Sequence, residues 1–140
     1  MKFIPSLILL SLLLTWGTGC ATSSATRKVM ALDRFQKIYV EKRLNDNHHL
    51  DELFVAELKR MGREASSGPL TMMPENTEAL LTYDARWEWD FKRYLIGIEI
   101  NLHNVHPRKK LADGNYHQPT IFPKTPDKVI HILIDNMFNR

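Results

Sequence analysis

Hydrophobic and polar residues alternate through the middle of the chain. From residue 81 to residue 90 the apolar side chains stand at odd positions, and from residue 94 to residue 103 every even position is apolar. A period of two is typical of a strand with one buried face. Because only Asp90 to Arg93 separates the two segments, they are predicted to pair as an antiparallel hairpin whose apolar residues share one face. These residues are Leu81, Tyr83, Ala85, Trp87 and Trp89, followed by Tyr94, Ile96, Ile98, Ile100 and Leu102.

Two other segments show the helical period. Apolar residues recur every three or four positions in 50–61, which is preceded by the capping residues 45–47 and followed by Gly62. The same period returns in 126–138, where Thr125 stands as a cap before the first helical position. Both segments are predicted to be amphipathic helices that bury one side.

Weaker patterns complete the predicted fold. Residues 35–44 favour a strand, residues 111–117 a less regular strand, and residues 70–73 a short edge strand. The main order is strand, helix, strand, strand, strand, helix. It predicts one α+β domain over residues 35–140, a two-layer sandwich in which both helices cover one face of a mainly antiparallel sheet of three to four strands.

The first 19 residues belong to a different physical class. Lys2 is their only charged residue, and an apolar run follows from Phe3 to Trp16. A helix of that length spans only about 20 Å, whereas the hydrocarbon core of a bilayer is about 30 Å thick. A permanent membrane span is therefore not expected, and residues 1–19 are predicted to be a signal peptide.

The only cysteine of the chain, Cys20, directly follows the small residues Gly17-Thr18-Gly19. This arrangement resembles the lipobox of bacterial lipoproteins, although Gly17 stands where that family usually has an aliphatic residue. The resemblance implies cleavage after Gly19 and a lipid on Cys20. It also implies an outer-membrane address facing the periplasm, because Ala21 rather than Asp follows. The alternative is a plain secretory signal cut at an alanine such as Ala21 or Ala25, with Cys20 discarded.

Residues between the cysteine and the domain are small and polar. The sequence ATSSAT ends at Thr26 and shows no period, so residues 20–34 are predicted to form the lipidated cysteine and a flexible tether. Residues 27–34 continue that tether or form a first short turn.

Several phrases of the domain, EALLTYDARWEWD, YLIGIEINLHN and KKLADGNY before a closing helix, resemble small bacterial outer-membrane lipoproteins of unassigned function. The same topology occurs in periplasmic α/β lipoprotein domains related to curli secretion and to activators of penicillin-binding proteins. The resemblance implies an envelope-assembly or interaction role, and it transfers no catalytic residue.

Composition narrows the range of functions. The formal net charge of the chain is +3, and it falls to +2 when residues 1–19 are set aside. A positive charge this small excludes the basic profile of a nucleic-acid-binding protein. A single cysteine excludes internal disulfides. There is no GxSxG motif, and the acidic residues Asp84, Glu88 and Asp90 fit the solvated face of a strand. We therefore expect no catalysis and no cofactor.

Two groups of side chains remain candidates for function. Trp87 and Trp89 either fill the core beneath the helices or form an exposed aromatic surface for a protein or glycan partner. Three histidines near one end of the hairpin, which we call the hairpin-end histidines, offer metal ligands. They are His103, His106 and His117. The main hypothesis is a membrane-anchored, non-catalytic module that binds an envelope protein. The alternative is a periplasmic metal-binding protein or metal-dependent hydrolase.

Overall fold

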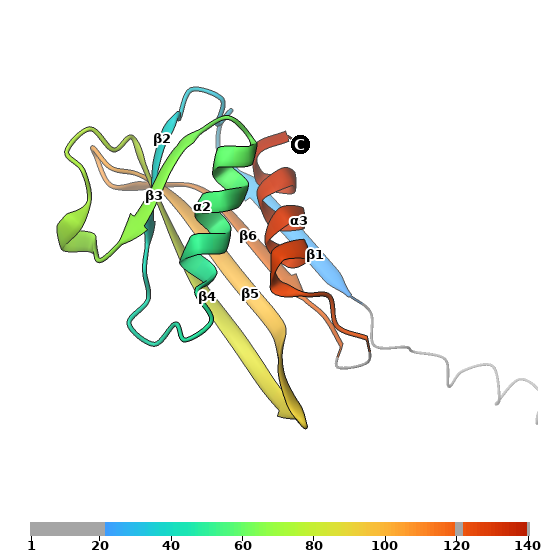
Figure 1. The fold of residues 1–140 in the computed structure, drawn as a ribbon. Coiled ribbons are helices and arrows are strands. Elements are labelled where there is room, and N and C mark those ends of the chain that lie inside the picture. Colours follow the sequence, from blue (N-terminus) through green and yellow to red (C-terminus); the bar gives the residue numbers. More distant parts are fainter. Residues whose placement is uncertain (1–21, 120–121, 140) are drawn as a thin grey trace, which may run out of the picture.

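The computed structural model describes residues 22–119 and 122–139, which form an α+β fold with two α-helices and an open six-stranded mixed sheet. The elements are β1 (Ser23–Lys28), β2 (Lys37–Glu41), α2 (Leu50–Arg60), β3 (Glu64–Gly68), the 3-10 helix η2 (Leu70–Met72), β4 (Ala79–Asp90), β5 (Lys92–Asn104), β6 (Lys109–His117) and α3 (Pro126–Asn139). The strands lie in the order β1-β6-β5-β4-β2-β3 (Figure 1).

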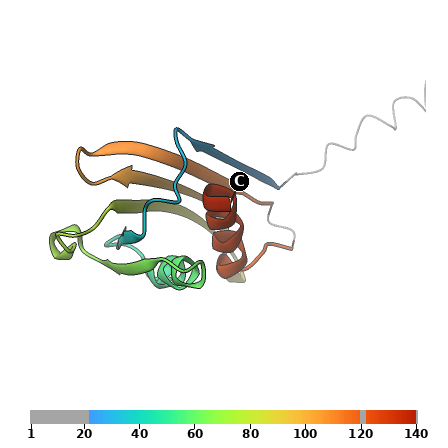
Figure 2. The same cartoon turned by 90° about the horizontal axis from the view of Figure 1, so that it is seen from above.

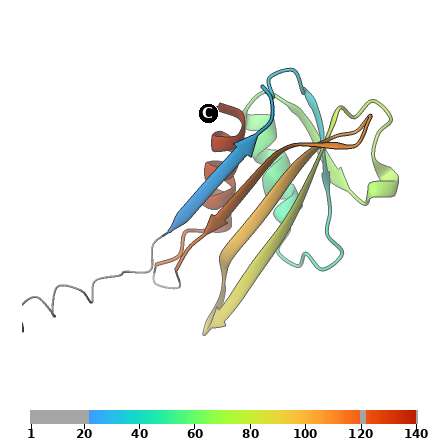
Figure 3. The same ribbon diagram turned by 180° about the vertical axis from the view of Figure 1, so that it is seen from behind.

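Both helices lie on the same face of the sheet, as Figure 2 shows from above. Leu58 of α2, Leu133 of α3 and Ile100 of β5 are fully buried between the two layers. We call the opposite side of the sheet the open face, and Figure 3 shows that neither helix covers it. The predicted α+β class and the placement of both helices are thus confirmed.

The prediction of three to four strands is wrong, because the sheet gains a polar strand at each edge. β1 pairs antiparallel with β6 and occupies residues expected in the tether, and β3 pairs parallel with β2. β2 also runs parallel to β4, so the sheet is mixed. Edge strands bury few side chains, and backbone hydrogen bonds define them instead. The sequences SSATRK and EASSG therefore lack the alternation that revealed β4 and β5.

Residues 70–73 were predicted to form an edge strand, and this is also wrong. Leu70–Met72 forms η2, in which the backbone N–H of Met72 donates to the carbonyl of Pro69. The proline fixes the backbone at the start of this turn.

The β4–β5 hairpin is confirmed, but its register changes near the turn. Leu81 faces Leu102 and Ala85 faces Ile98, whereas Trp87 faces Leu95, so Ile96 is passed over as a bulge. One extra residue reverses which side chains point to a given face. Leu95 is therefore buried in the core, whereas Ile96 and Tyr94, both expected there, are only half-buried.

The α2 helix ends at the glycine that the sequence indicated. Gly62 has a φ of 81°, a left-handed conformation that costs glycine little. Its N–H donates to the carbonyl of Lys59 and closes the helix. Among the described residues no helix is long and apolar enough to cross a bilayer.

Candidate functional site

The β4–β5 hairpin extends beyond the two helices. We call its end, residues 87–95, the hairpin tip; it projects past α2 and α3 in Figure 1. The 11 residues of α2 span about 16 Å, whereas the 12 residues of β4 span about 40 Å. The helices are thus too short to cover the whole hairpin, and its tip lacks a helical layer.

Trp87 lies at the boundary between the core and this projection. Its indole stacks on the imidazole of His48, with ring centroids 3.7 Å apart and an interplanar angle of 18°. The side chain is half-buried and packs against the edge of the core. Trp87 therefore packs partly in the core, at its edge, rather than wholly at the surface.

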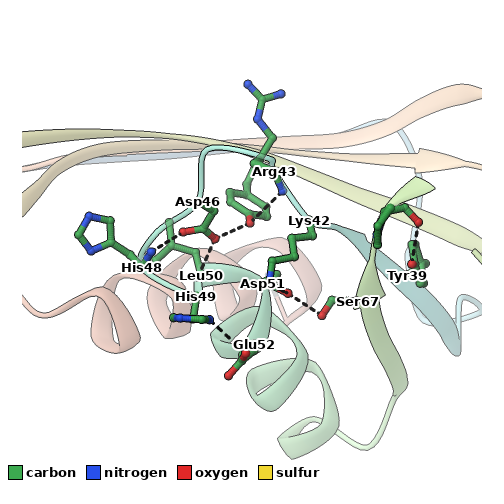
Figure 4. A network of polar contacts seen from close by, with 12 residues as sticks. Tyr39, Lys42, Arg43, Asp46, His48, His49, Leu50, Asp51, Glu52 and Ser67 are labelled. Carbon is green, nitrogen blue, oxygen red and sulfur yellow. Dashed lines mark hydrogen bonds and ion pairs between the residues drawn. The ribbon is translucent and has the colours of Figure 1, made fainter. Parts of the chain in front are cut away.

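Asp46 holds the loop that carries His48 (Figure 4). Its carboxylate accepts hydrogen bonds from the backbone N–H groups of His48, at 2.9 Å, and Leu50, at 2.8 Å. It also accepts a hydrogen bond from the Tyr83 hydroxyl at 2.6 Å. Asp46, one of the predicted capping residues 45–47, thus caps the first N–H of α2, although the N-cap position itself is His49, whose side chain makes no capping hydrogen bond. The same contacts position His48 against the hairpin.

The same contacts set the acidity of Asp46 and Tyr83. Burial by itself raises the pKa of Asp46, but the hydrogen bonds from Tyr83 and from the backbone outweigh burial and hold the pKa below its usual value. Burial, followed by the hydrogen bond to Asp46, raises the pKa of Tyr83 well above its usual value. Asp46 is consequently ionised and Tyr83 protonated at neutral pH.

Trp89 and Phe91 occupy the exposed part of the hairpin tip. Trp89 is 68% exposed and Phe91 is 95% exposed, with their ring centroids 6.5 Å apart. Phe91 forms the turn itself and has a φ of 57°, which a bulky residue rarely adopts. The structure thus separates the two predicted tryptophans, with Trp87 against the core and Trp89 at the surface.

A third exposed aromatic residue, Phe122, belongs to the same end of the molecule. It is 96% exposed in the segment that connects β6 to α3. Gln118 fixes this segment beside the hairpin, because its side chain donates to the Leu95 carbonyl at 2.6 Å and accepts from the Lys124 N–H at 2.8 Å. Within residues 22–119 and 122–139, Trp89, Phe91 and Phe122 are the exposed aromatic side chains. We call them the aromatic end.

Sequence reasoning did not identify Phe91 or Phe122 as surface residues of interest. Neither belongs to a periodic segment, so the pattern of buried faces says nothing about them. The lengths of the predicted helices and strands could have indicated them, because two helices of ordinary length cannot cover a hairpin of this size.

The open face of the sheet carries a polar groove of about 450 Å³. The Arg86 guanidinium lies across Gly97, where a Cβ would stand 3.5 Å from the Arg86 Nε. The groove is lined by Ser23, Asp84, Arg86, Ile98, Glu99, Asn115, Tyr116 and His117. Such a surface can bind a polar partner through charges and amide groups.

The three hairpin-end histidines are not brought together. His103 faces Lys110 in the β5–β6 register, whereas His117 faces Gly97, six residues away along β5 and therefore roughly 20 Å distant. His106 lies beyond the end of β5, in the turn to β6. Burial, and then the positive charges of Arg108 and Lys110, lower the pKa of His103.

A different group of possible metal ligands lies at the start of α2. Atoms of His49, Asp51 and Glu52 lie within 4.8 Å of one another. However, Asp51 already accepts a hydrogen bond from Ser67 at 2.8 Å and lies 3.8 Å from the Lys42 ammonium (Figure 4). Both contacts are made by Asp51 Oδ2, whereas Asp51 Oδ1 is buried without a hydrogen-bond partner among the described residues.

Cys20 and Gly19, the predicted lipidation and cleavage residues, lie outside the described residues. The described chain begins at Thr22, and β1 starts at Ser23. Only Ala21 and Thr22 separate Cys20 from this strand.

Comparison with known proteins identifies the fold. No protein-family model matches the chain, and a search of curated proteins finds no match. Among solved structures, a point variant of PelC from Paraburkholderia phytofirmans, a dodecamer in space group C2, is 15% identical with a TM-score of 0.62. The match covers 84% of this chain and 95% of that chain.

A second PelC structure from the same organism, a dodecamer in space group P6, is 14% identical with a TM-score of 0.61 and covers 83% of this chain and 94% of that one. A minor lipoprotein from Acinetobacter baumannii is 12% identical over 73% of this chain and 84% of that chain, with a TM-score of 0.32. The PelC matches show that this chain shares their fold over nearly the whole of their length.

Proposed function

We propose that this chain is a lipid-anchored protein of the bacterial outer membrane, facing the periplasm, and that its domain binds other envelope components without catalysing a reaction. The observation that carries the proposal is the place where the domain begins. β1 starts three residues after Cys20, so a lipid on that cysteine holds the sheet directly beside the membrane. A domain held this close to the membrane is suited to binding partners at the membrane surface.

The polar groove on the open face is the proposed surface for an envelope protein partner. Its charges are of both signs: Asp84 faces Glu99 across β4 and β5, and Arg86 stands two residues further along β4 opposite Gly97. Partners that recognise such a surface carry complementary charges and amide groups.

The anchor is tested by replacing Cys20 with serine in the full chain. We expect the Cys20→Ser protein to lose lipid labelling and to leave the membrane fraction or stay unprocessed, because the thiol that receives the lipid is gone. A wild-type protein that is soluble after export, with its N-terminus downstream of Ala21, contradicts the proposal.

The binding role is tested by cross-linking in cells. A photoreactive amino acid replaces Asn115, which lies in the groove, and a matched position on the helical side, Lys128, serves as control because it is exposed on α3. We expect a reproducible adduct from the groove position alone. Equal adducts from both positions contradict a specific surface there.

Self-assembly is a second candidate for the binding role. The PelC structures that share this fold are dodecamers, and in the part of this chain that the structure describes β1 and β3 form the two edges of the sheet. Unpaired edge strands can add a strand from another molecule. The mass of the detergent-extracted protein decides this point, because a monomer at all concentrations excludes self-assembly.

A further inference from the structure

The chain enters the domain at the same end from which the hairpin tip projects. β1 and β5 both run antiparallel to β6, so they are parallel to each other. Ser23 faces His117, and His117 faces Gly97, which places the start of β1 level with Gly97. Figure 3 shows β1 starting toward the end of the sheet where β4 and β5 meet.

The hairpin tip reaches further from the domain than the anchor can. From the level of Gly97, β5 continues five residues to Lys92, which is roughly 16 Å. From Ser23 the chain has three residues to Cys20, which is at most about 11 Å. When Cys20 is held at a membrane surface and the strands point toward it, the tip must meet the bilayer.

We propose that the aromatic end inserts into the interfacial region of the bilayer that holds Cys20, so that the domain contacts the membrane at two points. This inference rests on the lipid anchor proposed above. The aromatic end thus binds lipid, and this second contact with the membrane fixes the orientation of the domain.

The chemistry of the aromatic end matches such an environment. Tryptophan combines a large apolar ring with one N–H donor and favours the boundary between hydrocarbon and water. Around it the charges cancel, because Glu88 and Asp90 accompany Lys92 and Arg93 in the hairpin tip. Insertion is therefore driven by apolar burial, and we expect it in vesicles of neutral lipid and at high salt.

Fluorescence of Trp89 tests the inference directly. The experiment uses the mature lipidated protein, purified from membranes and reconstituted into phosphatidylcholine vesicles with brominated acyl chains, which quench nearby indoles. With Trp87→Phe, Trp89 is the only tryptophan after Cys20. We expect its emission to shift to the blue and to lose intensity relative to vesicles without bromine.

Two matched variants serve as controls. In Trp89→Phe the remaining indole, Trp87, is covered by His48 and should be quenched much less. Val29, which is 64% exposed, follows β1 at the opposite end of the strands. The variant with Val29→Trp in place of both native tryptophans should show no quenching, and quenching there overturns the proposed orientation.

The outcomes separate this inference from the anchor. Protein that carries acyl chains and binds vesicles, but whose Trp89 is not quenched, overturns the second contact and leaves the anchor intact. A blue shift without quenching places Trp89 against protein and also overturns it. Protein without acyl chains by mass spectrometry overturns the anchor, and this inference with it.

Discussion

Replacing Trp87 by alanine measures how far the core extends along the β4–β5 hairpin. Truncation of a fully buried tryptophan costs about 3 to 5 kcal/mol. Trp87 is half-buried, so the packing loss is about 2 kcal/mol, and the lost stack on His48 adds about 0.5 to 1 kcal/mol. We expect Trp87→Ala to lower the free energy of unfolding by about 2 to 3 kcal/mol.

Trp89→Ala and Glu88→Ala are the matched comparisons. Trp89 is on the same face two residues further along but is 68% exposed, and Glu88 is exposed on the other face. Each should change the free energy of unfolding by less than about 0.5 kcal/mol. The assay is urea unfolding followed by far-ultraviolet circular dichroism, which does not depend on the tryptophans. Equal losses for Trp87→Ala and Trp89→Ala would refute the boundary drawn between core and projection.

Four further predictions concern stability, pH and metal. Asp46→Ala should lower the free energy of unfolding by about 2 to 4 kcal/mol, because it removes the cap and leaves the Tyr83 hydroxyl without its acceptor. The fold depresses the pKa of Asp46, so ionised Asp46 stabilises the folded protein fully above the unfolded pKa of about 3.9, and this stabilisation is lost as pH falls through the folded pKa. The free energies of unfolding of wild type and Asp46→Asn should therefore converge as the pH is lowered in acid unfolding experiments. Gly68→Ala should cost about 1 to 3 kcal/mol, because its Cβ would stand 2.5 Å from the Tyr39 hydroxyl oxygen, and Tyr39→Phe should relieve much of that cost when the two are combined. The domain should purify without metal and keep its melting temperature in chelator; stoichiometric zinc that is lost in His103→Ala would favour the metal-binding alternative instead.

The sequence predicted the elements that bury a face. The helical stripes of α2 and α3 and the alternation of β4 correspond to the buried side chains of the core, because burial and periodicity have the same cause. The Asp46 cap was also visible, since a polar turn directly before a helical stripe is a common start signal.

The rest depends on contacts that leave no period in the sequence. β1 and β3 exist through backbone pairing at the sheet edges, and the bulge at Ile96 is a shift of register opposite Arg86 and Trp87, which the alternation along a single strand does not reveal. The aromatic end depends on where the helices stop along the hairpin. The hairpin-end histidines looked close because they are near in sequence, but the length of β5 separates His103 from His117.

The mass of the N-terminal peptide tests the central claim most directly. The protein is extracted from bacterial membranes, digested, and its N-terminal fragment measured by mass spectrometry. We expect a fragment that begins at Cys20 and carries the added mass of acyl chains. A fragment that begins at Thr22 or further along the chain, with no lipid, would contradict the account.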